Sequence, residues 1–168
     1  MLPRSLPLTP GLTDYSFRRI VIARGALMTR SYPIQHLTRK AFAPYGAILD
    51  HYQEQDGYEI VAAIESTGWL WALKTFHNQG IECIDCHPDT RESFEPVWGT
   101  SVLVVAPPDR PADLQAFLLD QPVLLNERVW HGLIALSAEA RVKITENRQV
   151  TGIPHPLGFE LRPVLASG

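Results

Sequence analysis

At 168 residues, the chain has the length of a single domain with a hydrophobic core of its own. Its hydrophobic content of 45% and charged content of 20% are ordinary for a globular protein, and a net charge of −3 gives no electrostatic basis for binding nucleic acid. No apolar run approaches the roughly 18 residues of a membrane-spanning helix, so we expect neither nucleic acid nor a membrane as a partner.

The basic residues gather near the start of the chain. Residues 1–40 hold seven basic residues and one acidic residue. An Arg-rich, acid-poor segment resembles a transit peptide, but three early prolines would interrupt any amphipathic helix there. Met28 is a second candidate start, and no apolar signal segment precedes it. We therefore expect a cytoplasmic protein, with residues 1–31 an extension of unknown role and residues 32–168 the patterned domain.

Short elements are expected along the whole domain, because fourteen prolines and eleven glycines divide it into short apolar runs. Thr38 is predicted to cap a one-turn helix that ends before Gly46. A longer helix is predicted at 111–119, where Pro111 stands at the start and apolar residues follow at helical spacing. The tail 152–158 is predicted to be irregular. Strands are predicted at 47–49, 58–64, 69–76, 81–87, 100–106, 122–125 and 141–145.

This pattern of many short strands predicts a mainly β protein. We expect an antiparallel barrel of the jelly-roll type, with one or two short helices. Within the predicted strand 69–76, alternation assigns Leu70, Ala72 and Lys74 to one face and the two tryptophans to the other. Barrels of this kind hold their ligands at the mouth.

A cluster of metal-ligand residue types stands between Gly80 and Gly99. Asp85 and His87 are two apart, so they point to the same side of a strand, and Glu92 follows beyond a turn at Pro88. His131 follows later, on a separate predicted strand. Carboxylate and imidazole groups suit Ni, Mn, Fe or Zn. We predict that Asp85, His87, Glu92 and His131 form a metal site, although a lone histidine on a barrel face is more often a satisfied core group.

The two cysteines offer a competing interpretation. Cys83 and Cys86 form a Cys-x-x-Cys-His run, which matches haem attachment, redox and zinc patterns. Residues three apart on a strand face opposite sides, however, so the two sulfur atoms cannot easily meet. We therefore expect two reduced, buried thiols, with Cys83 a weak candidate neighbour of the metal.

Three further residues are candidates for binding a small anionic substrate. Lys74 shares a face with Leu70, and its ammonium group suits a substrate carboxylate, although an edge-strand lysine facing water is a comparable interpretation. Arg91 lies in the turn before Glu92, where most arginines are simply solvated. Trp130 precedes His131 and, like Trp98 beside the first ligand block, is expected in the barrel core; it is also a candidate for a pocket wall.

The same residues carry a resemblance to known families. The spacing of Gly80, the ligand pair, Glu92 and Gly99 resembles the first motif of the cupins, with Asp85 where the first histidine usually stands. The runs 37–50, 87–96, 101–117 and 129–131 are similar, in order, to motifs of the ureidoglycolate lyase family. The resemblance covers roughly residues 33–150.

The resemblance implies both a fold and an activity. The family consists of cupin β-barrels, usually dimers, which cleave ureidoglycolate to glyoxylate and urea in purine and allantoin breakdown, with nickel or a similar divalent ion. It implies catalytic roles for His87, Glu92 and His131 and a homodimer. Alternatives that remain open are another metal-dependent cupin enzyme, an isomerase or dioxygenase acting on a small acid, and a non-catalytic binding cupin.

The chain departs from the family pattern at the edge of the expected site. Glu92 stands where the family usually has glutamine, and Arg91 replaces a small residue. Gly132 replaces a second histidine after His131, and Leu133 follows where proline is common. The acidic pair of Asp85 and Glu92 favours metal binding, while the altered rim leaves the substrate open.

Overall fold

The regular secondary structure in the described part of the chain is almost entirely β, as the sequence predicts. The computed structural model describes residues 20–24, 30–50, 60–62 and 68–165. The elements within these ranges are β1 Ile20–Arg24, β2 Ser31–Gln35, α1 Arg39–Phe42, β3 Gly46–Ile48, β4 Trp69–His77, β5 Ile81–Cys86, β6 Glu92–Trp98, β7 Ser101–Ala106, β8 Gln115–Leu118, β9 Val123–Leu125, β10 Trp130–Ala135, β11 Glu139–Asn147 and β12 Ile153–Leu165. No helix in these ranges has the length and apolar character that crossing a membrane requires.

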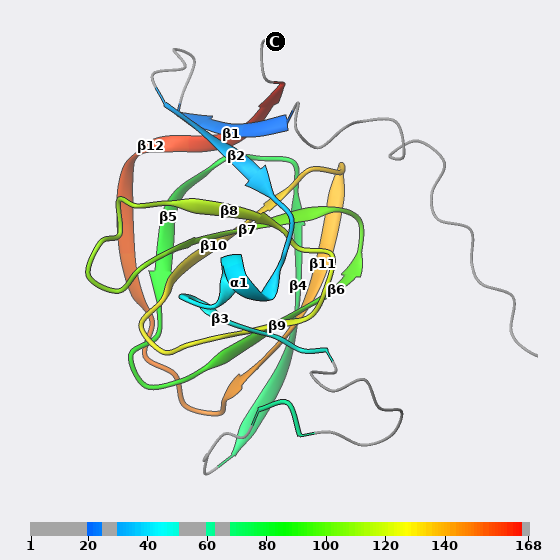
Figure 1. Cartoon of the computed structure of the whole chain (residues 1–168), viewed down its shortest axis with the longest axis vertical. Coiled ribbons are helices and arrows are strands. Elements are labelled where there is room, and N and C mark those ends of the chain that lie inside the picture. Colours follow the sequence, from blue (N-terminus) through cyan, green and yellow to red (C-terminus); the bar gives the residue numbers. More distant parts are fainter. Residues whose placement is uncertain (1–19, 25–29, 51–59, 63–67, 166–168) are drawn as a thin grey trace, which may run out of the picture.

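The strands form two sheets (Figure 1). The barrel sheet closes on itself in the order β1-β12-β5-β10-β7-β8-β2, and the five-stranded sheet has the order β3-β9-β6-β11-β4. The pairings are antiparallel except for the parallel contact of β2 with β8. This double-sheet architecture confirms the predicted cupin-like β-barrel. β1, which comes from within the predicted N-terminal extension, pairs with both β12 and β2.

Two apolar clusters lie on the two faces of the barrel sheet. The interior cluster joins the two sheets, and its large buried members include Phe94, Leu103, Phe117, Leu133 and Ile144. The second cluster lies on the other face and includes Ile22, Ile84, Val104, Ile134 and Leu161. β7 is buried along its whole length because its alternate side chains enter both clusters. Each fully buried large apolar side chain stabilises the fold by about 1.5–3 kcal/mol.

The predicted one-turn helix is present as α1. The Thr38 side chain accepts a hydrogen bond from the Ala41 backbone N–H, which satisfies one of the free donors at the helix start. Gly46 then begins β3, and a Cβ atom there would collide with the Leu124 carbonyl. Glycine at this position therefore allows the close pairing of β3 with β9.

The predicted helix at 111–119 is wrong. A turn follows Pro111, and Gln115–Leu118 form β8, which pairs with β7 and β2. Ala116 and Leu118 enter the second cluster, whereas Phe117 enters the interior cluster. Because both faces of this strand are buried, its apolar residues are nearly continuous, and that run imitates helical spacing.

The prediction of an irregular tail at 152–158 is also wrong, because residues 153–165 form the long strand β12. Pro154 and Pro156 are exposed and pair opposite Asp85 and Cys83 of β5. The fixed φ of proline is compatible with extended backbone, so proline ends helices more reliably than it ends strands. The register shifts before Leu161, in the region where Gly158 has a positive φ of 72°.

Three smaller predictions also differ from the structure. Residues 60–62 form no strand, and the rest of the predicted strand 58–64 lies outside the described residues. Both cysteines are free, as predicted, but only Cys86 is buried and Cys83 is half-buried. Trp98, expected in the core, is 64% exposed at the end of β6.

Candidate metal centre

Three ionisable side chains converge at one end of the interior between the sheets. His131 is the second residue of β10 in the barrel sheet, and Glu92 is the first residue of β6 in the five-stranded sheet. His87 lies in the connection between β5 and β6, which passes from one sheet to the other. This return of the chain brings Glu92 over the histidines, as its place beyond the Pro88 turn predicts.

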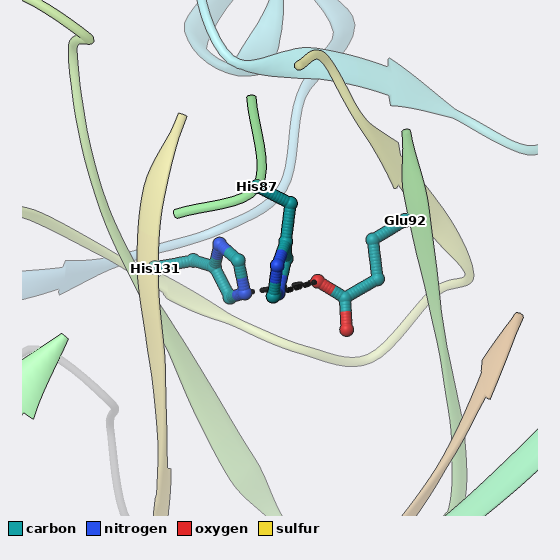
Figure 2. Close-up of side chains that lie close together, drawn as sticks. All are labelled: His87, Glu92 and His131. Atoms are coloured by element: carbon teal, nitrogen blue, oxygen red, sulfur yellow. Dashed lines mark ion pairs between the residues drawn. The ribbon is translucent and has the colours of Figure 1, made fainter. Parts of the chain in front are cut away.

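The three side chains point toward one another (Figure 2). Glu92 Oε2 lies 2.9 Å from His131 Nε2 and 3.4 Å from His87 Nε2. One ligand atom from each residue lies within 4.8 Å of the others. Glu92 and His131 are buried, and Phe94 packs edge-on against the His131 ring with centroids 5.3 Å apart. Two nitrogen donors and one carboxylate oxygen at this spacing can hold a metal ion.

The other ring nitrogen of each histidine faces a backbone carbonyl. His87 Nδ1 lies 3.1 Å from the Thr151 oxygen, and His131 Nδ1 lies 3.0 Å from the Val129 oxygen. Only a protonated nitrogen can donate to a carbonyl, so each neutral ring carries its proton on Nδ1. Both Nε2 lone pairs then face Glu92. Carbonyl partners of this kind orient the histidine ligands of metal sites.

The electrostatics of the cluster favour a positive charge within it. Burial on its own lowers the pKa of His131, but the adjacent Glu92 carboxylate outweighs that effect, so the pKa is raised above its ordinary value. Glu92 Oε2 is enclosed and accepts no aligned hydrogen bond from the described residues. When both rings are neutral, the enclosed carboxylate oxygen and the two imidazole lone pairs are three acceptors without a donor, which a proton on His131 or a metal ion would satisfy.

Asp85, the fourth predicted ligand, lies beside this cluster and not within it. It pairs opposite His131 in the β5–β10 ladder, so the two side chains leave the same face, but Asp85 is exposed. Its charge contributes to the raised pKa of His131. The group of three whose ligand atoms approach one another in the described residues does not include it.

Trp130 leaves β10 on the side opposite to His131. Its indole N–H donates to the Pro108 carbonyl at 3.1 Å, and its ring lies 5.2 Å from that of His155. Gly132, the departure from the family pattern, leaves on the Trp130 side, where a Cβ would lie 2.7 Å from a methyl group of Ile81. A larger residue at 132 would therefore press on β5 and would not reach the metal centre.

Arg91 and Lys74, the two residues predicted to bind the substrate carboxylate, lie in different surroundings. Arg91, adjacent to Glu92, donates a hydrogen bond to the Asn126 side chain and is half-buried. Lys74 is exposed on β4, opposite Val142 in the β4–β11 ladder. Arg91 also lines a cavity of about 350 Å³ with Ala62, Trp69, Trp71, Thr145, Glu146 and Asn147.

Glu146 is a residue near the centre that the sequence analysis missed. Burial raises its pKa, the Glu92 charge adds to this, and the charges of His87 and His131 oppose it. All three members of the cluster therefore lie close enough to act on this carboxyl group. The signal was present in the alternation of Val142 and Ile144, but the predicted strand ended at residue 145.

Comparison with known proteins gives one consistent family. No family model matches the chain. A ureidoglycolate lyase of Rhizobium etli is 31% identical over 120 residues, which cover 58% of this chain and 72% of that protein. A ureidoglycolate lyase of Agrobacterium fabrum is 31% identical over 126 residues, covering 62% of this chain and 76% of that protein. Among solved structures, a point mutant of Bacillus subtilis oxalate decarboxylase aligns with a TM-score of 0.41 and 17% identity, over 54% of this chain and 24% of that one.

Proposed function

Because the chain belongs to the ureidoglycolate lyase family, we propose that it cleaves a ureido acid, ureidoglycolate, to glyoxylate and urea. The observation that carries the proposal is the convergence of His87, Glu92 and His131 at one end of the interior between the two sheets. A family relationship alone would leave open whether this chain retains a reactive centre. A set of donors that is oriented by backbone carbonyls supports the proposal that it does.

We propose that these three residues hold a divalent metal ion, Ni, Mn, Fe or Zn. The fit rests on the two Nε2 atoms and Glu92 Oε2, which are acceptors facing one another in a buried place. Mixed nitrogen and oxygen donors suit these metals. Asp85 would be the fourth protein ligand if its exposed carboxylate turned toward His131, its neighbour across the ladder.

The proposed reaction requires two proton movements. One carbon of ureidoglycolate bears a hydroxyl, a carboxylate and a urea nitrogen, so cleavage requires loss of the hydroxyl proton and protonation of the leaving nitrogen. The metal would supply Lewis acidity, lowering the pKa of the bound hydroxyl group. The chain would supply orientation, with Arg91 or Lys74 holding the substrate carboxylate.

We also propose a substrate class, an oligomeric state and a cellular location for the enzyme. A small anionic substrate and a homodimer are what the family resemblance implies, and a cytoplasmic location is predicted from the sequence; all three remain predictions. The net charge of −3 still argues against nucleic acid. Gel filtration with light scattering measures the oligomeric state directly, and a monomer at micromolar concentration would contradict the dimer.

The test is turnover by protein purified without chelator. Metal analysis should find one divalent ion per chain, and adding ureidoglycolate should release glyoxylate and urea in equal amounts. His87→Ala should abolish this, whereas His155→Ala, outside the cluster, should retain activity. Metal-loaded protein that consumes oxygen, or that turns over other 2-hydroxy acids but not ureidoglycolate, would reject this substrate in favour of another metal-dependent enzyme.

A further inference from the structure

Glu146 continues an interior row of side chains on β11. Val142 and Ile144 belong to the interior cluster, and alternation places Glu146 on the same side, one step beyond Ile144. In Figure 1, β11 lies beside β6, and the ladder pairs Ile144 with Phe94 and Thr145 with Ser93. One further step along this ladder sets Glu146 beside Glu92.

The surroundings of Glu146 link the metal centre with the cavity. The β11–β6 ladder leads from Ile144 and Phe94 toward Glu146 and Glu92, and Glu146 lines the same cavity as Arg91. The charges of the cluster also act on the pKa of its carboxyl group. None of the described residues forms a hydrogen bond or ion pair with its side chain. It is therefore a half-buried acceptor, next to the proposed metal, whose hydrogen-bonding capacity is left unused by the residues that the structure describes.

We propose that Glu146 binds the ureido group of the substrate and so selects ureido acids over simple hydroxy acids. The inference rests on the proposed function of the same site. In ureidoglycolate, the hydroxyl and carboxylate suited to a metal and the urea nitrogen share one carbon atom. The ureido group must therefore lie within a few bonds of the metal, which is where Glu146 stands.

The chemistry of the two groups is complementary. A ureido group is planar and presents parallel N–H donors, while a carboxylate offers two acceptor oxygens that can receive them as a pair. Such charge-assisted hydrogen bonds are among the stronger ones in proteins. A hydroxy acid without the ureido group would leave Glu146 without a donor, and this difference would produce the selectivity.

Two probes that differ in the ureido group test the inference by binding alone. Hydantoate carries a carboxylate and a ureido group but no hydroxyl, and glycolate carries a carboxylate and a hydroxyl but no ureido group. Isothermal titration would compare metal-loaded wild-type protein with Glu146→Gln, Glu146→Asp and the control Glu139→Gln. Glu139 lies on the same strand and forms an exposed ion pair with Arg141.

The expected result is a selective loss. Glu146→Gln should weaken hydantoate binding about tenfold or more and leave glycolate binding within about twofold, with Glu146→Asp between wild type and Gln. Glu139→Gln should behave as wild type. Unchanged hydantoate affinity in Glu146→Gln, or wild-type protein that binds no hydantoate, would overturn the inference. So would reduced metal content in Glu146→Gln, because Glu146 would then be a metal ligand.

This readout separates the inference from the proposed function. Binding requires no turnover, so Glu146-dependent hydantoate binding in a protein that releases no glyoxylate would retain the ureido site and reject the lyase reaction. Glyoxylate release with hydantoate binding independent of Glu146 would do the reverse. Circular dichroism of each variant verifies that it is folded.

Discussion

The interior between the two sheets holds an apolar layer and, next to it on the same strands, an ionisable layer. The neighbouring interior positions are Phe94 and Glu92 on β6, Leu133 and His131 on β10, and Ile144 and Glu146 on β11. Phe94, Leu133 and Ile144 are buried members of the interior cluster. Glu92 and His131 are buried nearly as deeply, with 6% and 8% of their surfaces exposed.

The two layers have opposite energetic consequences. Burial of the apolar side chains stabilises the fold, whereas burial of ionisable groups costs free energy unless partners compensate. Glu92 Oε2, with no aligned hydrogen bond from the described residues, is incompletely compensated. The comparison therefore predicts that changes in the apolar layer reduce stability, and that changes in the ionisable layer alter binding with small or even favourable effects on stability.

The largest effect is expected from opening the apolar layer. Leu103 is fully buried in the interior cluster, so Leu103→Ala removes its packing and leaves a cavity. The free energy of unfolding should fall by about 2–5 kcal/mol. Urea denaturation followed by circular dichroism measures this, and the folded fraction should retain its metal content.

The matched control is another leucine in a strand of the opposite sheet. Leu73 is 62% exposed on β4, so Leu73→Ala should change the free energy of unfolding by no more than about 0.5 kcal/mol. Equal destabilisation by the two variants would contradict the assignment of the core. Loss of metal in Leu103→Ala at full folding would contradict the separation of the two layers.

The apolar layer was largely predictable from the sequence. Alternation in β4 separated Trp69 and Trp71 from the face of Leu70 and Ala72, and in the structure the two tryptophans are 59% and 65% exposed. The spacing of His87 and Glu92 around a proline turn likewise predicted their meeting, because a strand, a turn and a returning strand are local geometry. The convergence with His131 depended on a resemblance to a known motif, since no local rule brings residues 44 positions apart together.

The remaining features depend on long-range pairing. β8 is a strand because β7 and β2 lie on either side of it, and its own apolar residues fit a helix as well. Glu146 became a candidate only when the ladder with β6 set it beside Glu92. Whether Asp85 turns inward depends on a rotation at an exposed position, which its place in the strand does not determine.

Within the ionisable layer, the largest effect is expected on metal affinity. His131→Ala removes one of three converging donors and should weaken metal binding by more than about tenfold. Titration of chelator-treated protein with Ni or Zn measures this. His155→Ala removes a half-buried imidazole that lies against Trp130, and should bind metal as the wild type does. Equal affinity in His131→Ala and wild type would remove His131 from the centre.

The smallest effect, a gain in stability, is expected from Glu146→Gln in metal-free protein. Burial, reinforced by Glu92, raises the pKa of Glu146, so the folded state favours the neutral carboxyl group. Below the ordinary glutamate pKa of 4.5 the group is neutral in both states, and its charge costs nothing. As pH rises through the raised folded pKa, ionisation reduces the stability of the wild type, whereas glutamine stays neutral.

Glu146→Gln should therefore be more stable than wild type at pH 7, by up to about 1 kcal/mol, and equal to it near pH 4. Urea denaturation at both pH values measures the difference, and a variant less stable at pH 7 would mean that the Glu146 charge stabilises the fold, contrary to its place in the ionisable layer.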